Sequence, residues 1–377
     1  MKSILANIGR YFRQTDLILI LLCLSASVIG FVMIGGIVYA EMTGIRDLLM
    51  QIAATTLGIG GMVVVSLFDY RMLARLWKLH VPAAILLVLI TMIFGQGRGE
   101  ADDIAWLVIP ITENFSFSLQ PSELLKISYV LSFALHLETV RDSLNRLRTL
   151  IPVCIHGIYP ALLIHFMGDD GTALVFLCVF ISMIFAAGLS WKYIAVAIPA
   201  GIAAIPILWN FVMTQDQKDR FMVILKPGYD LQNIGWQQYQ GNISIGSGQL
   251  WGIGIFSPEH RTSIPEIQND FIFAFIGESV GFIGALGVIL LLTAIALRIL
   301  MNSTVSQDYL GKFICVGIFA IVMFQTLINI GMCLSILPVI GITLPFLSCG
   351  GTSVATLYLG IGLVVSVFMH NKTTLFS

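Results

Sequence analysis

The stretch LILILLCLSASVIGFVMIGGIVYA occupies residues 17–40 and contains no charged side chain. As an α-helix it is long enough to cross the hydrocarbon core of a bilayer, which needs about 17 to 25 predominantly apolar residues. It follows a basic amino end and finishes with Val38-Tyr39-Ala40, a sequence that resembles a signal-peptidase site. Because its apolar core is far longer than the roughly 7 to 15 residues of a signal peptide, we expect it to be retained as a membrane anchor.

The composition of the whole chain agrees with a membrane protein. Of its 377 residues, 57% are hydrophobic and only 11% are charged, whereas soluble domains carry roughly 25% charged residues. The mean hydropathy is +0.92. Charges are too few to cover a water-exposed surface, which excludes a disordered chain, a secreted disulfide scaffold and a nucleic-acid binder. The 6 cysteines lie in apolar stretches with no C-x-x-C pair, so we expect small buried hydrophobic residues there.

Ten apolar stretches are long enough to span the membrane as helices. They cover about 17–40, 48–67, 79–95, 120–138, 150–167, 171–189, 192–213, 270–298, 310–337 and 345–369. The sequence therefore predicts an all-α polytopic membrane protein in which residues 1–377 form one integral-membrane domain. A long loop, about 214–269, joins the seventh and eighth spans, and its aromatic rings (Trp236, Tyr239, Trp251, Phe256) favour an interfacial segment over disorder.

The distribution of charge predicts the orientation, because inner loops of membrane proteins are enriched in lysine and arginine. With the amino end inside, the inner segments carry 13 of the 20 basic residues. These are Lys2, Arg10, Arg13, Arg71, Arg75, Lys78, Arg141, Arg146, Arg148, Lys192, Arg298, Lys312 and Lys372. Acidic residues show the opposite bias, with about 14 of the 21 outside. An even number of spans then places both termini in the cytoplasm and the long loop on the extracytoplasmic side.

Charged side chains within spans are costly and mark candidate functional sites. The fourth span opens with Gln120-Pro121-Ser122-Glu123-Leu124-Leu125-Lys126. Proline fixes the helix start, and Glu123 and Lys126, three residues apart, share one face near the outer leaflet. The pair is interpreted either as an ion pair that makes two buried charges tolerable or as the wall of a polar cavity, and the two interpretations are compatible.

Further ionisable residues fall on the same outer side. Asp270 opens the eighth span, with Glu278 some 12 Å deeper at about 1.5 Å per residue. Asp169 and Asp170 lie between the fifth and sixth spans. A proton or ion pathway would distribute such groups through the membrane depth, so we favour binding or chemistry at the outer leaflet. The run Gly350-Gly351-Thr352-Ser353, by contrast, is expected to serve close helix packing.

Several blocks together resemble the SEDS family of bacteria (shape, elongation, division and sporulation proteins). They are Phe115-Ser116-Phe117 to Lys126, Ile245-Gly246-Ser247-Gly248, Pro265-Glu266, Asp270-Phe271-Ile272-Phe273-Ala274 with Gly277-Glu278, and the ending Asn329-Ile330-Gly331-Met332 through Ser353. The match covers nearly the whole chain. The rod-shape branch of the family is the nearer likeness and the division branch the second.

The resemblance implies a ten-helix glycosyltransferase of the cytoplasmic (inner) membrane that polymerises lipid II, a lipid-linked disaccharide-peptide, for cell-wall elongation and cell shape. By position, Asp270 matches the catalytic aspartate, and the resemblance also implies that Asp270 is a ligand of a divalent cation, Mg or Mn. The likeness further places Glu123 and Lys126 in a functional polar pair, with Glu278, Asp169, Gln120 and Ser122 around the cavity. The implied partners are a class B penicillin-binding transpeptidase and other membrane proteins of the elongation complex.

The implied chemistry suits these residue types. A carboxylate such as Asp270 can act as general base toward an attacking sugar hydroxyl, and Lys126, Arg220 or Arg261 can neutralise a departing pyrophosphate. The chain departs from the family pattern at Ala105, which precedes Trp106 in place of arginine, at Met167-Gly168 before Asp169, and at Gly241. A lipid II flippase, a division-type polymerase and a non-catalytic scaffold are the alternative functions.

Overall fold

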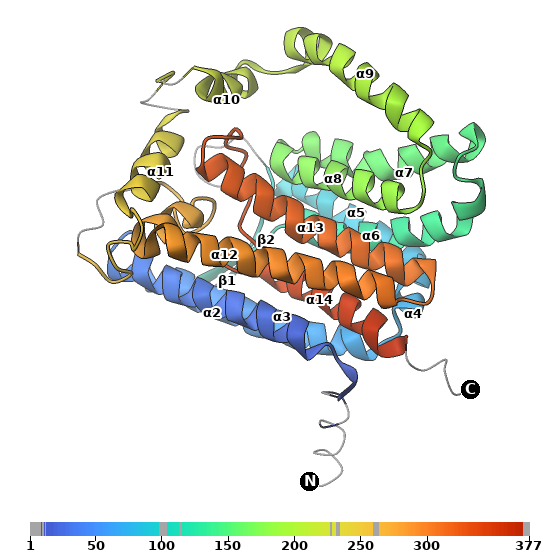
Figure 1. Ribbon diagram of the computed structural model, residues 1–377, viewed down its shortest axis with the longest axis horizontal. Coiled ribbons are helices and arrows are strands. Elements are labelled where there is room, and N and C mark those ends of the chain that lie inside the picture. Colours follow the sequence, from blue (N-terminus) through green and yellow to red (C-terminus); the bar gives the residue numbers. More distant parts are fainter. Residues whose placement is uncertain are drawn as a thin grey trace.

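The computed structural model describes residues 9, 11, 13–97, 104–112, 115–226, 228–230, 234–258 and 264–371. Each of the ten expected spans coincides with a helix (Figure 1). These helices are α2 (Leu17–Tyr39), α3 (Ile45–Leu67), α5 (Trp77–Phe94), α6 (Pro121–Val140), α7 (Leu147–His165), α8 (Asp170–Ala186), α9 (Trp191–Ile207) with the π-helical turn η2 (Leu208–Val212), α12 (Ile272–Val305), α13 (Tyr309–Cys333) and α14 (Gly351–His370).

Eight of the helices in the described part of the chain are long and apolar enough to cross a membrane. Of the other two expected spans, α8 is 17 residues long, and α6 is 20 residues long but carries Glu123, Lys126 and Glu138. Two of these charged residues, Glu123 and Lys126, are the ones that make α6 a candidate for function. The expected all-α polytopic fold is therefore observed.

The connections contain shorter elements that hydropathy does not reveal. Helix α4 (Tyr70–Arg75) and the 3-10 turn η1 (Arg141–Ser143) lie at one end of the bundle. At the other end, β1 (Leu107–Thr112) pairs antiparallel with β2 (Phe115–Leu119) just before α6. The long loop between the seventh and eighth spans contains α10 (Gln215–Leu225) and α11 (Trp236–Ser247).

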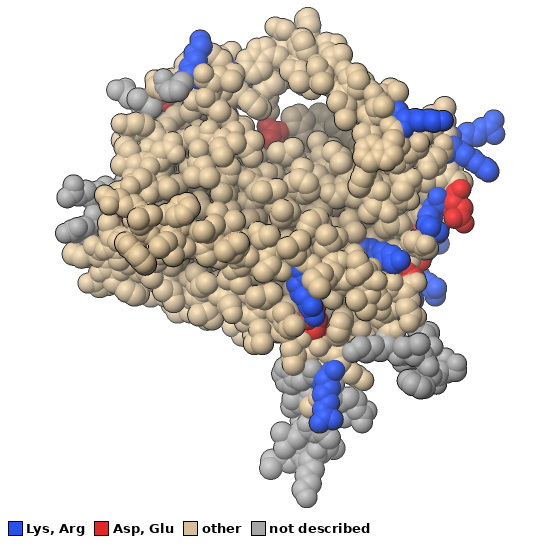
Figure 2. Space-filling view, in the orientation of Figure 1, with Lys and Arg blue, Asp and Glu red and all other residues tan. Residues whose placement is uncertain are grey.

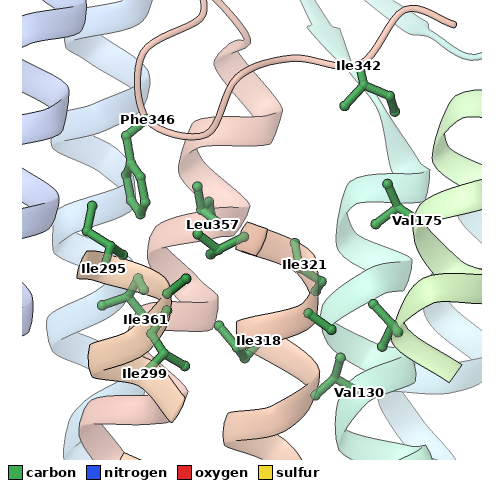
Figure 3. Close-up of a cluster of buried hydrophobic side chains, with 14 of the residues drawn as sticks. Val130, Val175, Ile295, Ile299, Ile318, Ile321, Ile342, Phe346, Leu357 and Ile361 are labelled. Carbon is green, nitrogen blue, oxygen red and sulfur yellow. The ribbon is translucent and has the colours of Figure 1, made fainter. Parts of the chain in front are cut away.

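Helices α13 and α14 form the centre of the bundle. Most of their residues are buried, and they pack against α3, α6, α8 and α12. Figure 3 shows branched side chains from these elements meeting between the helices, among them Val130 of α6, Val175 of α8, Ile295 of α12, Ile318 of α13 and Ile361 of α14. This core fixes the helices whose outer ends carry the site.

Helix α9 is the exception to this packing. None of its residues is buried, and it is seen in Figure 1 as an arm standing off from α7 and α8. Its apolar side chains, such as Ile198 and Ile202, are 58% and 62% exposed. A helix that is apolar all round is stable only in a non-aqueous surrounding, so α9 is suited to lipid on all sides. Figure 2 shows an opening beneath the arch that α9 and α10 form.

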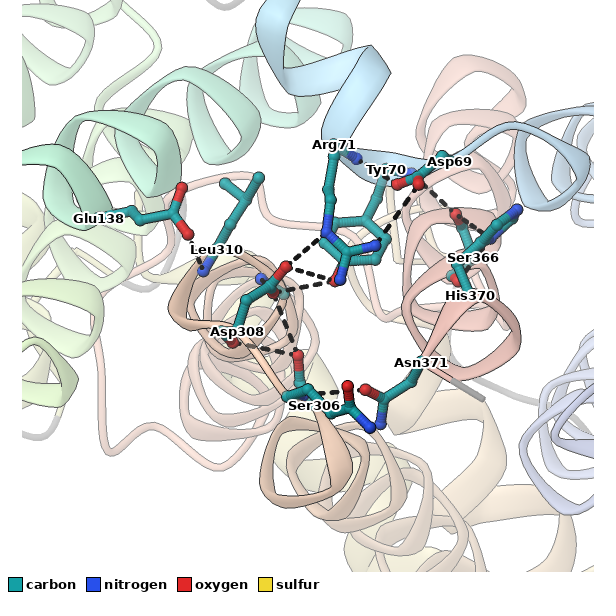
Figure 4. Close-up of polar contacts among 12 residues, drawn as sticks. Asp69, Tyr70, Arg71, Glu138, Ser306, Asp308, Leu310, Ser366, His370 and Asn371 are labelled. Atoms are coloured by element: carbon teal, nitrogen blue, oxygen red, sulfur yellow. Dashed lines mark hydrogen bonds and ion pairs between the residues drawn. The ribbon is translucent and has the colours of Figure 1, made fainter. Parts of the chain in front are cut away.

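A polar network ties several helices together at the end of the bundle where α14 finishes (Figure 4). The Asp308 carboxylate accepts hydrogen bonds from the Tyr70 hydroxyl at 2.8 and 2.9 Å, from Arg71 Nε at 2.6 Å and from the Gly311 amide at 2.8 Å. Nearby, Asp16 pairs with Arg298, their Oδ2 and Nε atoms 2.8 Å apart. Figure 2 shows basic side chains concentrated at this end, as expected for a cytoplasmic face.

Candidate functional site

Glu123 and Lys126 form a buried ion pair at the start of α6. Pro121 occupies the first turn, where its missing N–H has no cost, so the helix begins at a fixed residue. Lys126 Nζ lies 2.7 Å from Glu123 Oε1, with side chains only 3% and 8% exposed. The second carboxylate oxygen accepts a hydrogen bond from Thr356 Oγ1 at 3.3 Å. A void of about 10 Å³, bounded also by Gln325, adjoins the pair; such a space holds about one water.

Gln120 and Asp169 extend this polar group toward the outer surface. Gln120 Nε2 donates to Asp169 Oδ2 at 3.1 Å, and Asp169 Oδ1 caps α8 by accepting the Thr172 amide at 2.9 Å. Burial raises the pKa of the Asp169 carboxyl, and the Thr172 bonds oppose that rise. Ser122 Oγ is buried with no hydrogen-bond partner among the described residues. Five of the six predicted cavity residues thus lie together at the start of α6: Gln120, Ser122, Glu123, Lys126 and Asp169.

Asp270 lies in the turn that precedes α12. The helix itself begins two residues later than the hydropathy suggests, at Ile272, so the main chain of Asp270 is not part of the helix. Instead its amide donates to the Glu266 carbonyl at 3.2 Å, and its own carbonyl accepts Asn329 Nδ2 at 2.8 Å. Asp270 Oδ2 faces Gly341 so closely that a Cβ there would lie 3.6 Å from it.

Residues 337–344, the Gly341 segment, lie against both the Asp270 turn and the start of α8. Its Gly341 has φ of +68° and lies against the Asp270 carboxylate. One residue earlier, the Ile340 carbonyl packs on Gly171 at the start of α8, where an added Cβ would approach it to 2.2 Å. From α10, Arg220 Nη1 donates to the Val339 carbonyl at 3.1 Å. The Arg220 guanidinium therefore binds the main chain of this segment. Arg261 lies outside the described residues.

Glu278 is buried deeper in α12, beneath the loop that follows α11. Its Oε2 accepts Ser244 Oγ of α11 at 3.2 Å. Three residues on, α12 is interrupted at Gly281, whose φ of 67° and ψ of −168° are not helical. The loop repairs the break: Ile253 and Gly254 amides donate to the Glu278 and Ser279 carbonyls, each at 3.0 Å, and the Phe282 amide donates to Gln249 O at 2.8 Å. Backbone groups freed at membrane depth must find such partners.

A larger cavity of about 310 Å³ opens on the outer face beside the Asp270 turn. Gln268 and Asn269, which immediately precede Asp270, form part of its wall, together with Trp106. Charged side chains of both signs also line it, from Arg46, Asp47 and Glu266. An aromatic ring surrounded by polar groups is the type of surface that sugars bind, so this cavity is the candidate substrate site.

The described residues do not form a resident metal site. Within these ranges no group of three or more histidine, cysteine, aspartate or glutamate side chains is arranged to hold an ion. Among these residues Asp270 would therefore share a cation with at most one further ligand of these types, unlike the three or four ligands of a dedicated zinc site. Magnesium needs fewer, since it is usually bound by one or two carboxylates plus substrate phosphates.

Three contacts of the site were not predicted. Thr356 binds the Glu123 carboxylate, and Thr352 Oγ1 accepts the Gln120 amide at 3.3 Å. The two threonines thus form hydrogen bonds to the polar group of α6. The sequence led us to expect only close helix packing for residues 350–353. Asn329 is the third, and its bond to Asp270 spans 59 residues. The signal for the threonines was their i, i+4 spacing on a span that faces α6, but no sequence pattern indicates the Asn329 contact.

Known proteins share both the sequence and this architecture. The FtsW–RodA–SpoVE family, described as "Cell cycle protein", matches residues 16–373. The peptidoglycan glycosyltransferase MrdB of Escherichia coli K12 is 32% identical over 298 residues, 78% of each chain. The probable peptidoglycan glycosyltransferase FtsW of Geobacter metallireducens is 30% identical over 386 residues, 99% of this chain and 98% of that protein.

A solved structure extends the likeness to the fold. One chain of a structure titled "Structural coordination of polymerization and crosslinking by a peptidoglycan synthase complex" superposes with a TM-score of 0.80 at 24% identity, covering 95% of this chain and 99% of that one. Sequence and fold agree over nearly the full length. The chain therefore belongs to the SEDS family of shape, elongation, division and sporulation proteins, and is a multi-pass protein of the bacterial inner membrane.

Proposed function

We propose that the protein is a peptidoglycan glycosyltransferase that polymerises lipid II at the outer face of the membrane, for cell-wall elongation and cell shape. The observation that carries the proposal is the position of Asp270, which directly follows Gln268 and Asn269 in the wall of a 310 Å³ polar cavity and whose carboxylate lies near Gly341. Relatives named as peptidoglycan glycosyltransferases support the reaction class.

The reaction joins two lipid-linked sugars. A hydroxyl of the acceptor sugar attacks the anomeric carbon of the donor, a new C–O bond forms, and the bond from that carbon to the lipid pyrophosphate breaks. The Asp270 carboxylate takes the hydroxyl proton, so that charge does not build up on the attacking oxygen. The electron pair of the broken bond leaves with the pyrophosphate.

The surrounding residues would bind and orient the substrates. The Trp106 ring and the polar side chains of the cavity suit a sugar ring, and Arg46 suits a phosphate. The buried Glu123–Lys126 pair lies too deep to neutralise a departing group directly unless a water bridges it, so we assign it to holding α6 against α14. Because substrate phosphates bring most of the ligands that magnesium needs, we also propose a divalent cation requirement.

We further propose that the enzyme works with a class B penicillin-binding transpeptidase. The similar chain in a complex that coordinates polymerization with crosslinking supports such a partner. Peptidoglycan strands must be crosslinked as they emerge, and the cavity opens on the side where the transpeptidase would act.

One assay tests the function. Purified protein, alone and with its transpeptidase, receives labelled lipid II and Mg²⁺ or Mn²⁺, and products are separated on a gel. We expect glycan chains from the wild type and from Asp142→Asn, a control whose side chain is 98% exposed at the opposite end, but none from Asp270→Asn. Lipid II scrambling in vesicles without any polymer would instead indicate a flippase, and failure of both assays would leave the scaffold.

A further inference from the structure

Asn329 makes an unusual pair of contacts in the last two turns of α13. Its side chain is completely buried, and its one amide nitrogen donates to two main-chain carbonyls, Asp270 O at 2.8 Å and Ile342 O at 2.7 Å. A carboxamide nitrogen has two hydrogens, so both are used. One side chain thus joins two segments that are 72 residues apart in the chain, as the numbers 270 and 342 show.

Both carbonyls belong to the immediate frame of the Asp270 carboxylate. The first is the main-chain carbonyl of Asp270 itself. The second follows Gly341, where an added Cβ would lie 3.6 Å from Asp270 Oδ2. Asn329 therefore fixes the backbone from which the carboxylate extends and the surface that the carboxylate faces. One turn further along α13, Cys333 Sγ also approaches the Asp270 carbonyl, at 3.7 Å.

Packing alone does not account for an asparagine at this position. Its Oδ1 atom is buried and has no hydrogen-bond partner among the described residues. A buried oxygen without a hydrogen-bond partner lowers the stability of the fold. An apolar side chain of similar volume would not have this unpaired oxygen. Asp270 lies outside α12, in a turn whose own main-chain bond runs from the Asp270 amide to the Glu266 carbonyl. The bond from Asn329 to the Asp270 carbonyl ties this turn to α13.

We propose that Asn329 is a positioning residue for Asp270: it clamps the Asp270 turn to the Gly341 segment and so sets where the carboxylate meets the attacking hydroxyl. This role rests on the proposed glycosyltransferase function. Misplacing a catalytic group by about 1 Å costs on the order of 100-fold in rate, so loss of the clamp should lower kcat by about 10- to 100-fold while KM for lipid II changes by less than about 3-fold.

The test compares Asn329→Leu with Asn302→Leu. Asn302 is also a buried asparagine, 3% exposed, whose Nδ2 donates to Asp16 Oδ2 at the opposite end of the bundle. Both variants lose a buried amide, but only one of them touches Asp270. Asn329→Ser is a second variant in case the leucine prevents folding. For each folded protein, kcat and KM for lipid II are measured with the transpeptidase present, along with hydrogen exchange of peptides covering 266–272 and 339–344.

We expect the Asn329 variants to lose kcat and to exchange faster in both peptides, and Asn302→Leu to do neither. Unchanged exchange in these peptides, or a kcat per folded molecule equal to that of the wild type, overturns the proposal. If the wild type forms no polymer, the proposed function fails, and the exchange measurement alone then decides whether Asn329 clamps the two segments.

Discussion

Replacing Lys126 with methionine tests the buried ion pair most sharply. Methionine keeps the length and the apolar stem of lysine but removes its charge, which leaves the Glu123 carboxylate 8% exposed without its partner at 2.7 Å. Breaking a buried pair by removing one member costs about 3 to 5 kcal/mol. The adjoining void of about 10 Å³ admits about one water, and Thr356 still binds the carboxylate. We therefore expect the lower part of the range, about 3 kcal/mol.

The measurement is the free energy of unfolding in mixed micelles, followed by tryptophan fluorescence. The matched control is Lys192→Met, an exposed lysine at the start of α9, for which we expect a change within about 0.5 kcal/mol. The double variant Glu123→Leu with Lys126→Met removes both charges, so it should be less destabilised than Lys126→Met alone. A loss below about 1 kcal/mol for Lys126→Met, the size of an exposed pair, or strictly additive effects in the double variant would refute the reasoning.

Three more predictions concern the helix break, the polar network and the cation. Gly281→Ala should destabilise the protein by about 2 kcal/mol or more, because a Cβ at positive φ is strained and would lie 2.4 Å from Gly252 N. The control is Gly287→Ala, which has open space at its Cβ and should be neutral or slightly stabilising in the same unfolding assay. Burial raises the pKa of Asp308, but hydrogen bonds from Gly311, Tyr70 and Arg71 outweigh it and the net pKa is lowered. The stabilisation is then present above the unfolded value of about 3.9 and is lost as the pH falls through the folded value, so unfolding curves of the wild type and Asp308→Asn should converge in acid; a constant difference would contradict this. EDTA should abolish polymerisation, and Mg²⁺ or Mn²⁺ should restore it, without shifting the unfolding midpoint of the resting protein.

Hydropathy predicted the membrane helices well because each span has to satisfy the same bilayer. The first span, 17–40, matches α2 at Leu17–Tyr39, and the other nine helices also fall where apolar stretches lie. Among the starts of the spans, that of the tenth differs most: the chain is apolar from residue 345, but α14 begins at Gly351. Hydropathy reports burial, and the residues before Gly351 are buried without being helical.

The irregular conformation of residues 334–350 could not be predicted from the sequence pattern. Ser335, Gly341 and Phe346 have positive φ there, so helix is excluded. A buried irregular segment is stable only when other groups pair with its backbone. Gln238 of α11 does so by donating to the Met332 and Leu337 carbonyls at 3.0 and 2.7 Å, as Asn329 does further on. The two Gln238 bonds join residues 94 and 99 positions apart, and a single sequence carries no local signal for them.

The candidate site was predictable as a list of residues but not as an arrangement. The outer positions of Glu123, Lys126, Asp169 and Asp270 followed from the direction of each span. Their connection did not, because it passes through the Gly341 segment. Glu278 was expected near the cavity. It lies instead beneath α11 and the loop after it, where its carboxylate accepts the Ser244 hydroxyl close to the break in α12 at Gly281.

The central claim is that Asp270 performs the chemistry in a site that the rest of the fold positions. The most direct measurement is the rate of glycan polymerisation from lipid II by the purified Asp270→Asn variant, with the transpeptidase and Mg²⁺ present and the unfolding midpoint recorded alongside. Loss of a general base costs about 100- to 10,000-fold. We predict a loss of at least 100-fold with an unchanged midpoint; polymerisation within a few-fold of the wild-type rate would contradict the account.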